Sequence, residues 1–448
     1  MNQLEEIPRW KQQKALGMST LAFATCFAVW TIFSIIGVRL QDELGLNDTQ
    51  FGLLVGTPIL TGSISRIFLG IWTDQYGGRV IFPVVMIFAA VATYLLSNVN
   101  SYGVMLVAAL GVGLAGGAFA VGVAYVSKWY PKSQQGTALG IFGVGNIGTA
   151  VTTFVAPFVL VAFGWQVVAQ SWAAVLAVMA VIFWLTAEDD PELKARRLRG
   201  EKPKGLAHQL KPLQKIQVWR FSIYYFFAFG GMVALGLWLP RYLIDVYGLD
   251  IQTAGMLTVF YVIPASLFRA LGGYLSDTYG ARAVLYLTFG ASIVCTFILS
   301  YPDTDYVIHG IEGPITFSTG TGLVPFITII WVLGFSMGLS MAAVFKHIPV
   351  YYADHVGAVG GAVGMVGGLG GFVLPIAFGA MNDLTGIWTS CFMLLFGVVA
   401  VSLLWMHVAI RRMEQAALPE RMPELPELRQ MAVTPTRPRN IDGTESDA

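Results

Sequence analysis

The chain has 448 residues, of which 56% are hydrophobic and only 12% are charged. Its mean hydropathy of +0.66 excludes an ordinary soluble domain and is typical of a protein that crosses a membrane many times. The formal net charge of +1 gives no indication of nucleic-acid binding.

Twelve apolar runs are long enough to cross a bilayer, which takes about 20 residues of helix. A polar segment, residues 1–17, precedes the first run. That run is too long for the core of a signal peptide, so we expect it to remain as a spanning helix. The predicted spans are residues 18–39, 51–71, 80–98, 102–127, 136–163, 166–186, 218–243, 253–275, 281–300, 323–345, 356–380 and 387–410.

The loops between these runs alternate in charge. Lysine and arginine gather before the first run and after the even-numbered runs, whereas the opposite loops carry almost none except Arg39 and Arg241. The positive-inside rule therefore predicts that both termini are cytoplasmic. The basic linker at residues 187–217 separates two halves, and the Pro- and Glu-rich residues 411–448 are expected to form a disordered cytoplasmic tail.

An internal repeat relates the halves at 18–186 and 218–410. Arg66 and Arg269 each lie four positions before the first glycine of the pattern Gly-x-x-x-Asp-x-x-Gly-x-Arg, and every matched residue lies 203 positions further along. A parallel repeat of six-helix halves is the architecture of major facilitator transporters. The glycines of this motif permit a tight turn, and its charged residues are predicted to latch one conformation. These charged residues are Asp74, Arg79, Asp277 and Arg282.

Arg66 and Arg269 are the predicted centre of the substrate site. Each lies eight residues before the aspartate of its motif, or about 12 Å along a helix, which is close to the middle of the bilayer. A charge at that depth is costly and usually marks a substrate or ion pathway, although it can also snorkel or pair with a carboxylate. Since the interiors of the predicted spans contain no Asp or Glu, we expect one anion to be held between the two arginines.

The fifth and eleventh runs are rich in glycine, which lets helix backbones pack closely. They occupy corresponding places in the two halves, where a rocking interface must slide. Asn146 lies among the glycines of the fifth run and can donate to an oxyanion. A match to the dinucleotide-binding pattern at 143–148 is rejected because no strand precedes it. The glycines predicted to matter are Gly143, Gly145, Gly148, Gly367, Gly368 and Gly370.

The segments Gly143-Val-Gly-Asn-Ile-Gly148 and Gly364-Met-Val-Gly-Gly-Leu-Gly-Gly-Phe-Val-Leu-Pro375 resemble the paired signatures of the nitrate/nitrite porter family of the major facilitator superfamily. The resemblance covers almost all of residues 18–410. It implies an all-α polytopic membrane protein with twelve transmembrane helices in two six-helix pseudo-symmetric halves. It also implies that Arg66 and Arg269 clamp the substrate.

The resemblance assigns further residues to the site. Asn146 would be a polar contact, and three aromatic residues would line the substrate above and below its plane: Phe119, Tyr225 and Phe229. Nitrate and nitrite are small, planar anions, and the planar fork of a guanidinium suits their oxygens. The chain is thus expected to be a monomeric secondary transporter of nitrate and nitrite in the cytoplasmic membrane.

Exchange of nitrate for nitrite is the favoured mechanism, because closing the empty site would bury two unpaired cations facing each other. Proton symport, with His347 as a titratable group, is the alternative. An organic-anion or phosphate-ester exchanger and a non-transporting sensor are more distant alternatives.

An enzyme is not predicted, because no nucleophile, base or metal constellation is evident. The cysteines Cys26, Cys295 and Cys391 lie far apart in apolar runs, so neither a disulfide nor a metal site is expected. No cofactor is expected either.

Overall fold

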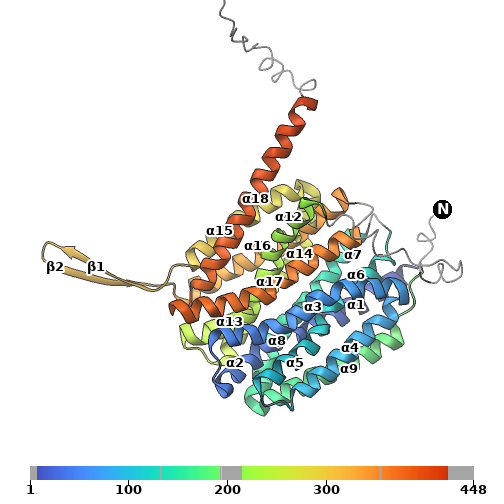
Figure 1. Cartoon of the computed structure of the whole chain (residues 1–448), viewed down its shortest axis with the longest axis horizontal. Helices are drawn as coiled ribbons and strands as arrows, with labels where there is room; N and C mark the ends of the chain where they lie inside the picture. The colour runs from blue at the N-terminus through green and yellow to red at the C-terminus, as the bar shows by residue number, and fades with distance from the viewer. Residues whose placement is uncertain (1–7, 132–133, 192, 194–213, 353–355, 422–448) are drawn as a thin grey trace, which may run out of the picture. The chain divides into compact units, whose positions relative to one another are not determined.

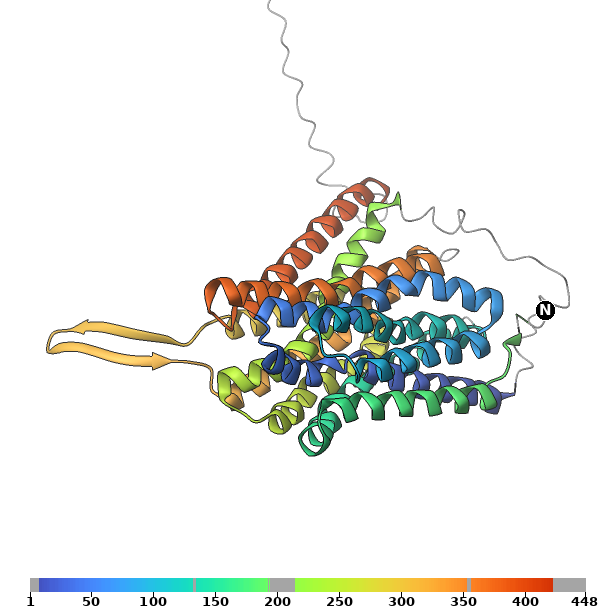
Figure 2. The same ribbon diagram turned by 60° about the horizontal axis from the view of Figure 1, so that its bottom comes forward.

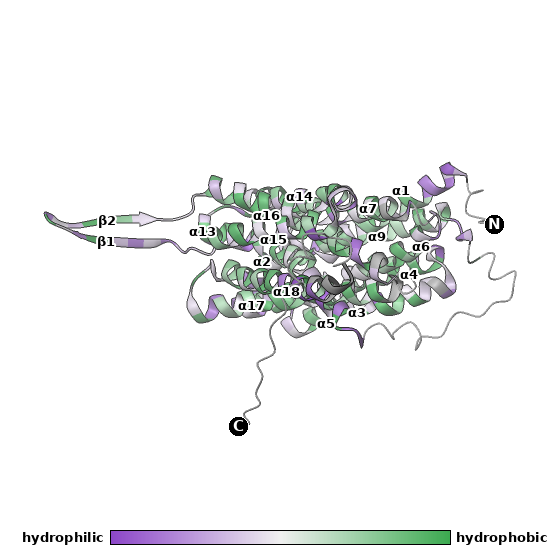
Figure 3. Ribbon diagram, turned by 90° about the horizontal axis from the view of Figure 1, so that it is seen from above, coloured by the Kyte–Doolittle hydropathy of each residue, from purple (hydrophilic) through white to green (hydrophobic). Residues whose placement is uncertain are grey.

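The computed structural model describes residues 8–131, 134–191, 193, 214–352 and 356–421. Within this part of the chain, twelve helical spans are long and apolar enough to cross a membrane, and each overlaps one predicted run. Figure 1 shows the helices packed side by side, and Figure 3 shows that they are apolar along most of their length. The prediction of a twelve-helix membrane protein is therefore confirmed.

The helices of the first half cover the first six spans. They are α1 (Arg9–Trp30), α2 (Phe33–Leu44), α3 (Asp48–Tyr76), α4 (Gly78–Leu96), α5 (Tyr102–Val112), η2 (Gly113–Gly117), α6 (Ala118–Ser127), α7 (Gln135–Gly143), η3 (Val144–Ile147), α8 (Gly148–Phe163) and α9 (Trp165–Thr186).

The second half contains six more spans and one short sheet. Its elements are α12 (Ile216–Tyr225), η5 (Phe226–Gly231), α13 (Met232–Tyr247), α14 (Ile251–Tyr279), α15 (Ala281–Leu299), β1 (Thr304–Gly310), β2 (Gly313–Thr319), α16 (Leu323–Tyr351), α17 (Val356–Thr385) and α18 (Ser390–Arg421). The packing divides the chain into two compact units after Ser402, and all residues of the candidate site and of the further inference belong to the first.

The boundaries differ from the predicted domains in two places. Helix α1 already begins at Arg9, within the segment expected to precede the first span, and α18 continues to Arg421, within the predicted tail. Most of the predicted linker at 187–217 and of the tail at 411–448 lies outside the described residues.

The repeat predicted from the sequence is visible in the backbone. Gly77 and Gly280 both adopt positive φ, +91° and +85°, where α3 turns into α4 and α14 into α15. Gly45 and Gly248, also 203 positions apart, end α2 and α13 in the left-handed region. Only glycine adopts these conformations at little cost, so the paired glycines set the same turns in both halves.

Three spans change their helical pitch in the middle of the bundle. The fourth and fifth pass through the 3₁₀ segments η2 and η3, and the seventh passes through a π-helical turn, η5. Irregular turns of this kind are frequent at functional sites. They bear directly on the predicted substrate residues, because Phe119 follows η2, Asn146 lies in η3 and Phe229 lies in η5.

The connection between α15 and α16, where the sequence predicts no helix or strand, forms a β-hairpin. Its strands β1 and β2 pair antiparallel from Thr304 opposite Thr319 to Gly310 opposite Gly313. The hairpin is evident in Figures 1 and 2. We call the side of the bundle where this hairpin and the α2–α3 and α13–α14 connections lie the hairpin end, and the opposite side the N-terminal end.

The two halves pack tightly at the hairpin end along two matching seams, α3 with α17 and α8 with α14. A Cβ atom on Gly52 would lie 2.2 Å from the carbonyl oxygen of Pro375. A Cβ on Gly255, the counterpart of Gly52 in the repeat, would lie 2.3 Å from the carbonyl oxygen of Thr153. Each glycine therefore permits backbone contact between the halves.

Two glycines nearer the N-terminal end of the same helices have open space around them. Among the residues that the structure describes, nothing lies within 4 Å of a Cβ placed on Gly273 of α14 or on Gly361 of α17. The halves are thus closed against each other at the hairpin end, where Gly52 and Gly255 pack against backbone of the opposite half.

Candidate functional site

Arg66 is almost completely buried, with 2% of its surface exposed. Its Nε donates to the carbonyl oxygen of Gly116 at 3.4 Å, and its Nη1 donates to that of Gly364 at 2.9 Å. Because Gly364 belongs to α17, the side chain bridges the two halves. Its Nη2 has no hydrogen-bond partner among the described residues.

Arg269 lies in the second half and is 6% exposed. Its Nη2 donates to the hydroxyl of Tyr225 over 3.4 Å, whereas its Nη1 has no partner in the described part of the chain. Among the described residues neither Arg66 nor Arg269 forms an ion pair with a carboxylate. Two buried guanidinium groups therefore each retain N–H donors without an acceptor, which favours an anion as ligand.

The ring of Phe119 lies close to both arginines. Its centre is 5.2 Å from the guanidinium carbon of Arg66 and 5.6 Å from that of Arg269. Both distances are within the range of a cation–π contact. Phe119 thus contacts two cations from helices that are far apart in the sequence.

Tyr225 and Phe229 form a stacked pair, with ring centres 5.2 Å apart and an angle of 7° between the rings. They lie on successive turns of the seventh span, where Phe229 is in the π-helical turn. Phe229 also contacts Arg66, whose guanidinium carbon is 5.1 Å from its ring centre, and Tyr225 contacts Arg269. This stack therefore presents flat surfaces beside both arginines.

Asn146 is completely buried, and neither its amide nitrogen nor its oxygen has a partner among the described residues. Leaving two polar atoms buried and unpaired is costly, so such a group usually has a binding role or an ordered ligand. Asn146 lies in η3, and Gly143 is the residue that precedes η3. A Cβ on Gly143 would lie 3.2 Å from the guanidinium carbon of Arg269.

The predicted glycines pack against site residues or neighbouring helices. A Cβ on Gly367 would lie 2.2 Å from the ring of Tyr225, and one on Gly368 would lie 2.3 Å from the hydroxyl of Ser63. A Cβ on Gly145 would meet the ring of Phe23. A Cβ on Gly148 would meet the backbone of Ala24, and one on Gly370 would meet the backbone of Gly230. Side chains at these positions would displace the aromatic rings or separate the helices.

The repeated loop motif makes its contacts within each half. Asp277 forms an ion pair with Lys346, and Arg282 donates to the hydroxyl of Tyr351 at 2.8 Å. The guanidinium carbon of Arg79 lies 5.7 Å from the ring of Trp184. The side chain of Asp74 lies outside the described part of the structure.

His347 has local partners on helix α16 and nearby. Its Nδ1 is 2.9 Å from the carbonyl oxygen of Ala343, one turn earlier, and its ring packs between Phe221 and Tyr351. These contacts provide a structural reason for a histidine at this position.

Sequence reasoning missed two residues beside the arginines. The guanidinium carbon of Arg269 is 5.9 Å from the ring of Phe345, which also packs against Tyr225. Ser63 is buried, and its hydroxyl has no partner among the described residues. A signal for Ser63 exists in the sequence, since it and Ser266 each precede a site arginine by three residues. No comparable signal distinguishes Phe345 from other phenylalanines.

Residues 18–330 match the family model described as Major Facilitator Superfamily. A protein of Thermus thermophilus named "Probable nitrate/nitrite antiporter NarK1" is 40% identical over 417 residues, which are 90% of this chain and 92% of that protein. The "Nitrite extrusion protein" of Bacillus subtilis (strain 168) is 30% identical over 401 residues, which are 89% and 95% of the two chains.

Solved structures agree on the fold. The nucleoside transporter NupG has a TM-score of 0.66 at 15% identity, with 88% of this chain and 99% of that chain covered. A bacterial homolog of the human lysosomal transporter Spinster, inward-facing and occupied, has a TM-score of 0.64 at 17% identity, with coverage of 88% and 96%. The family model matches more than half of this chain, and the two relatives are 30% and 40% identical to it over most of their own length. The chain therefore belongs to the nitrate/nitrite porter family of the major facilitator superfamily.

Proposed function

We propose that this protein carries nitrate and nitrite across the cytoplasmic membrane by alternating access, with one anion bound between Arg66 and Arg269. The observation that carries the proposal is the pair of buried guanidinium groups, one from each half, that keep unsatisfied N–H donors and no carboxylate partner in the described chain. The names of the relatives from Thermus thermophilus and Bacillus subtilis support nitrate and nitrite as the anions.

The geometry fits a small flat anion. Guanidinium donates in one plane and binds oxyanions through paired hydrogen bonds, which an ammonium group does not do in the same way. The rings of Phe119, Tyr225 and Phe229 offer apolar faces beside this plane, and the amide of Asn146 supplies a further donor. We propose that this arrangement favours trigonal nitrate and bent nitrite over tetrahedral phosphate or sulfate.

Exchange follows from the same charges. Without an anion, movement of the halves would bring two desolvated cations through a region of low dielectric, where like charges repel strongly. A bound anion offsets that repulsion, so the loaded protein reorients more readily than the empty one. Net uptake coupled to protons is the second mechanism that the test below distinguishes.

We also propose an orientation, in which both termini face the cytoplasm and the hairpin end faces outward, as the distribution of lysine and arginine indicates. In that orientation the tight packing of Gly52 and Gly255 at the hairpin end corresponds to an inward-facing state. The anion would then exchange with the cytoplasm from the N-terminal end.

The test is anion flux in proteoliposomes that contain the purified protein. Vesicles filled with nitrite, or with an anion that is not transported, receive external nitrate with and without a proton gradient. Exchange predicts nitrate uptake that requires internal nitrite and ignores the gradient. Uptake into nitrite-free vesicles that is driven by the gradient would establish symport instead, and no flux of either anion would refute the proposed substrate class.

A further inference from the structure

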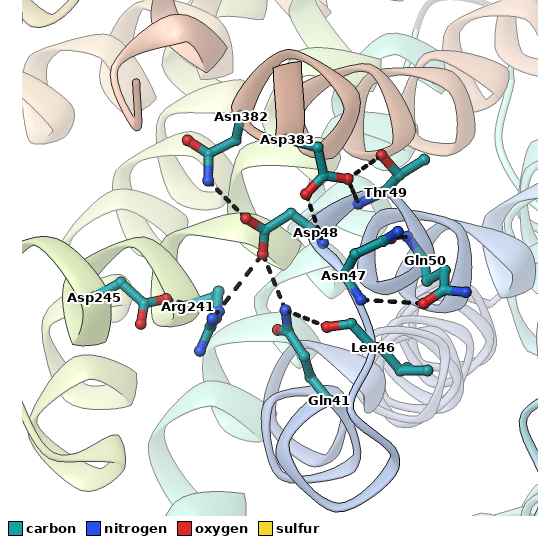
Figure 4. A network of polar contacts seen from close by, with 10 residues as sticks. All are labelled: Gln41, Leu46, Asn47, Asp48, Thr49, Gln50, Arg241, Asp245, Asn382 and Asp383. Atoms are coloured by element: carbon teal, nitrogen blue, oxygen red, sulfur yellow. Dashed lines mark hydrogen bonds and ion pairs between the residues drawn. The ribbon is translucent and has the colours of Figure 1, made fainter. Parts of the chain in front are cut away.

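A network of polar contacts joins the two halves at the hairpin end, where helix α3 begins and helix α17 ends (Figure 4). The first residues of α3 are Asp48 and Thr49, and the facing residues of α17 are Asn382 and Asp383. A Cβ on Gly379, one turn earlier in α17, would lie 2.1 Å from the carbonyl oxygen of Asp48. The two helix ends are therefore in direct backbone contact.

Asp383 caps the start of α3 from the other half of the protein. Its carboxylate accepts hydrogen bonds from the backbone N–H groups of Asp48 at 3.1 Å and Thr49 at 2.8 Å, and from the hydroxyl of Thr49. The first N–H groups of a helix have no partner within it, and a negative charge there is favourable. Asn47, within the same half as α3, supplies only part of the cap through the N–H of Gln50 at 2.8 Å.

Asp48 makes the reciprocal contacts. Its carboxylate accepts from the amide of Asn382 at 2.6 Å and lies 4.0 Å from Nη2 of Arg241, both in the second half. It also accepts from Gln41 of its own half at 2.9 Å. Arg241 is held in place by Asp245, which is 2.6 Å from its Nε. Each half thus presents a carboxylate to donors of the other half.

The matching seam of the repeat is built differently. The counterpart of Asn47 is Asp250, which caps α14 from within its own half by accepting from the N–H groups of Gln252 and Thr253. These hydrogen bonds, led by those from Thr253, lower the pKa of Asp250. Across the α8–α14 seam, Gly255 packs against Thr153 and Pro157 through apolar and backbone contacts.

We propose that Asp48, Thr49, Asn382 and Asp383 form a latch that holds the hairpin end closed, and that the α3–α17 seam, rather than the α8–α14 seam, limits its opening. The inference rests on the proposed alternating access. Opening at this end removes from α3 the part of its N-terminal cap that α17 supplies. Weakening the latch should therefore increase the fraction of molecules that are open at the hairpin end.

The test measures access to a single cysteine and does not use transport as its readout. Gly236 of α13 faces Thr149 and Val262, and a Cβ there would make ordinary contacts at 3.8 Å, so Gly236→Cys is compatible with the closed seam. The three native cysteines are buried. Intact cells are treated with a membrane-impermeant maleimide, and the rate of labelling is measured. The chain carries Gly236→Cys alone, or Gly236→Cys combined with one further substitution: Asp383→Ala, Thr49→Val or Asp250→Ala.

The latch predicts that Asp383→Ala accelerates labelling by about tenfold, since it removes hydrogen bonds to a charged group, and that Thr49→Val has a smaller effect in the same direction. Asp250→Ala is the matched control, because it removes a helix-capping carboxylate without breaking a contact between the halves. The latch would be overturned if Asp250→Ala accelerated labelling as much as Asp383→Ala does. It would also be overturned if neither Asp383→Ala nor Thr49→Val accelerated labelling. If Asp383→Ala does not accumulate, the result for Thr49→Val decides.

A second cysteine separates this inference from the proposed orientation. Ile311 lies in the turn of the hairpin and is fully exposed, so Ile311→Cys should be labelled in intact cells whether or not the latch is intact. Failure of Ile311→Cys to react would place the hairpin end inside the cell and refute the orientation. Flux that fails in proteoliposomes while the labelling pattern holds would refute the substrate and leave the latch supported.

Discussion

Gly367 lies directly against the ring of Tyr225, so close that a Cβ on the glycine would be 2.2 Å from Cδ1 of the tyrosine. Two carbon atoms that are not bonded to each other cannot lie this close, so the ring would have to move. Tyr225 is completely buried, stacks on Phe229 and accepts a hydrogen bond from Arg269. A glycine on α17 thereby fixes the position of an aromatic residue on α12 and of an arginine on α14.

Gly367→Ala should therefore reduce nitrate flux strongly, by about tenfold or more, because displacement of an aligned group by 1 Å is costly to function. Gly361→Ala, six residues earlier in the same helix, is the control, since nothing described lies within 4 Å of its Cβ. Flux in proteoliposomes containing equal amounts of each variant provides the measurement. Similar losses for the two variants would indicate a general effect of side chains on α17.

Arg66→Lys and Arg269→Lys should each abolish most transport while the protein still accumulates in the membrane. Lysine keeps the positive charge but loses the planar fork, and hydrogen bonds between charged groups contribute about 1.5–3 kcal/mol each. Affinity for nitrate should fall by about tenfold to a hundredfold. Uptake kinetics at several nitrate concentrations would test this, and near-normal flux in both variants would contradict the proposed clamp.

Tyr225→Phe should have a milder effect than either arginine variant. The substitution keeps the ring stacked on Phe229 but removes the hydroxyl that Arg269 contacts over 3.4 Å. Since this contact is long, we expect the KM for nitrate to change by only about twofold to tenfold. Tyr225→Ala, which also removes the stacking surface, should impair transport more. Equal kinetics for the two variants would argue against a role for the ring.

The seams at the hairpin end predict how glycine substitutions act on the conformational equilibrium. Gly52→Ala and Gly255→Ala should favour opening at this end, because a Cβ at either position would meet backbone of the other half within 2.3 Å. Gly273→Ala, with open space around its Cβ, should leave the equilibrium unchanged. Labelling of Gly236→Cys from outside distinguishes these outcomes, and equal labelling in all three backgrounds would refute the assignment of the closed end.

The sequence predicted the membrane spans well, for physical reasons. Runs of about 20 apolar residues are a strong signal because a bilayer has a fixed thickness. The repeat at an offset of 203 placed Arg66 and Arg269 at equal depth, and both are buried beside Phe119 in the structure. Charged residues are so costly in a membrane that their positions are informative without any structure.

Other features depend on three-dimensional contacts that no local pattern reveals. Arg39 and Arg241 were the exceptions to the charge rule, and the structure pairs them with Glu43 and Asp245. The cap that Asp383 provides to α3 joins residues 334 and 335 positions apart. A sequence pattern shows that a helix begins after Asn47, but not which distant side chain completes its cap.

The most direct test of the central claim is the number of nitrate ions bound per chain. Isothermal titration of the purified protein with nitrate, in a buffer free of competing anions, measures this number for the native chain, Arg66→Lys and Arg269→Lys. Because the two arginines are proposed to share a single anion, we predict one nitrate per native chain and a dissociation constant that is raised by about tenfold to a hundredfold in each single variant. Two nitrate ions per native chain, or an unchanged dissociation constant when either arginine is replaced, would contradict the account.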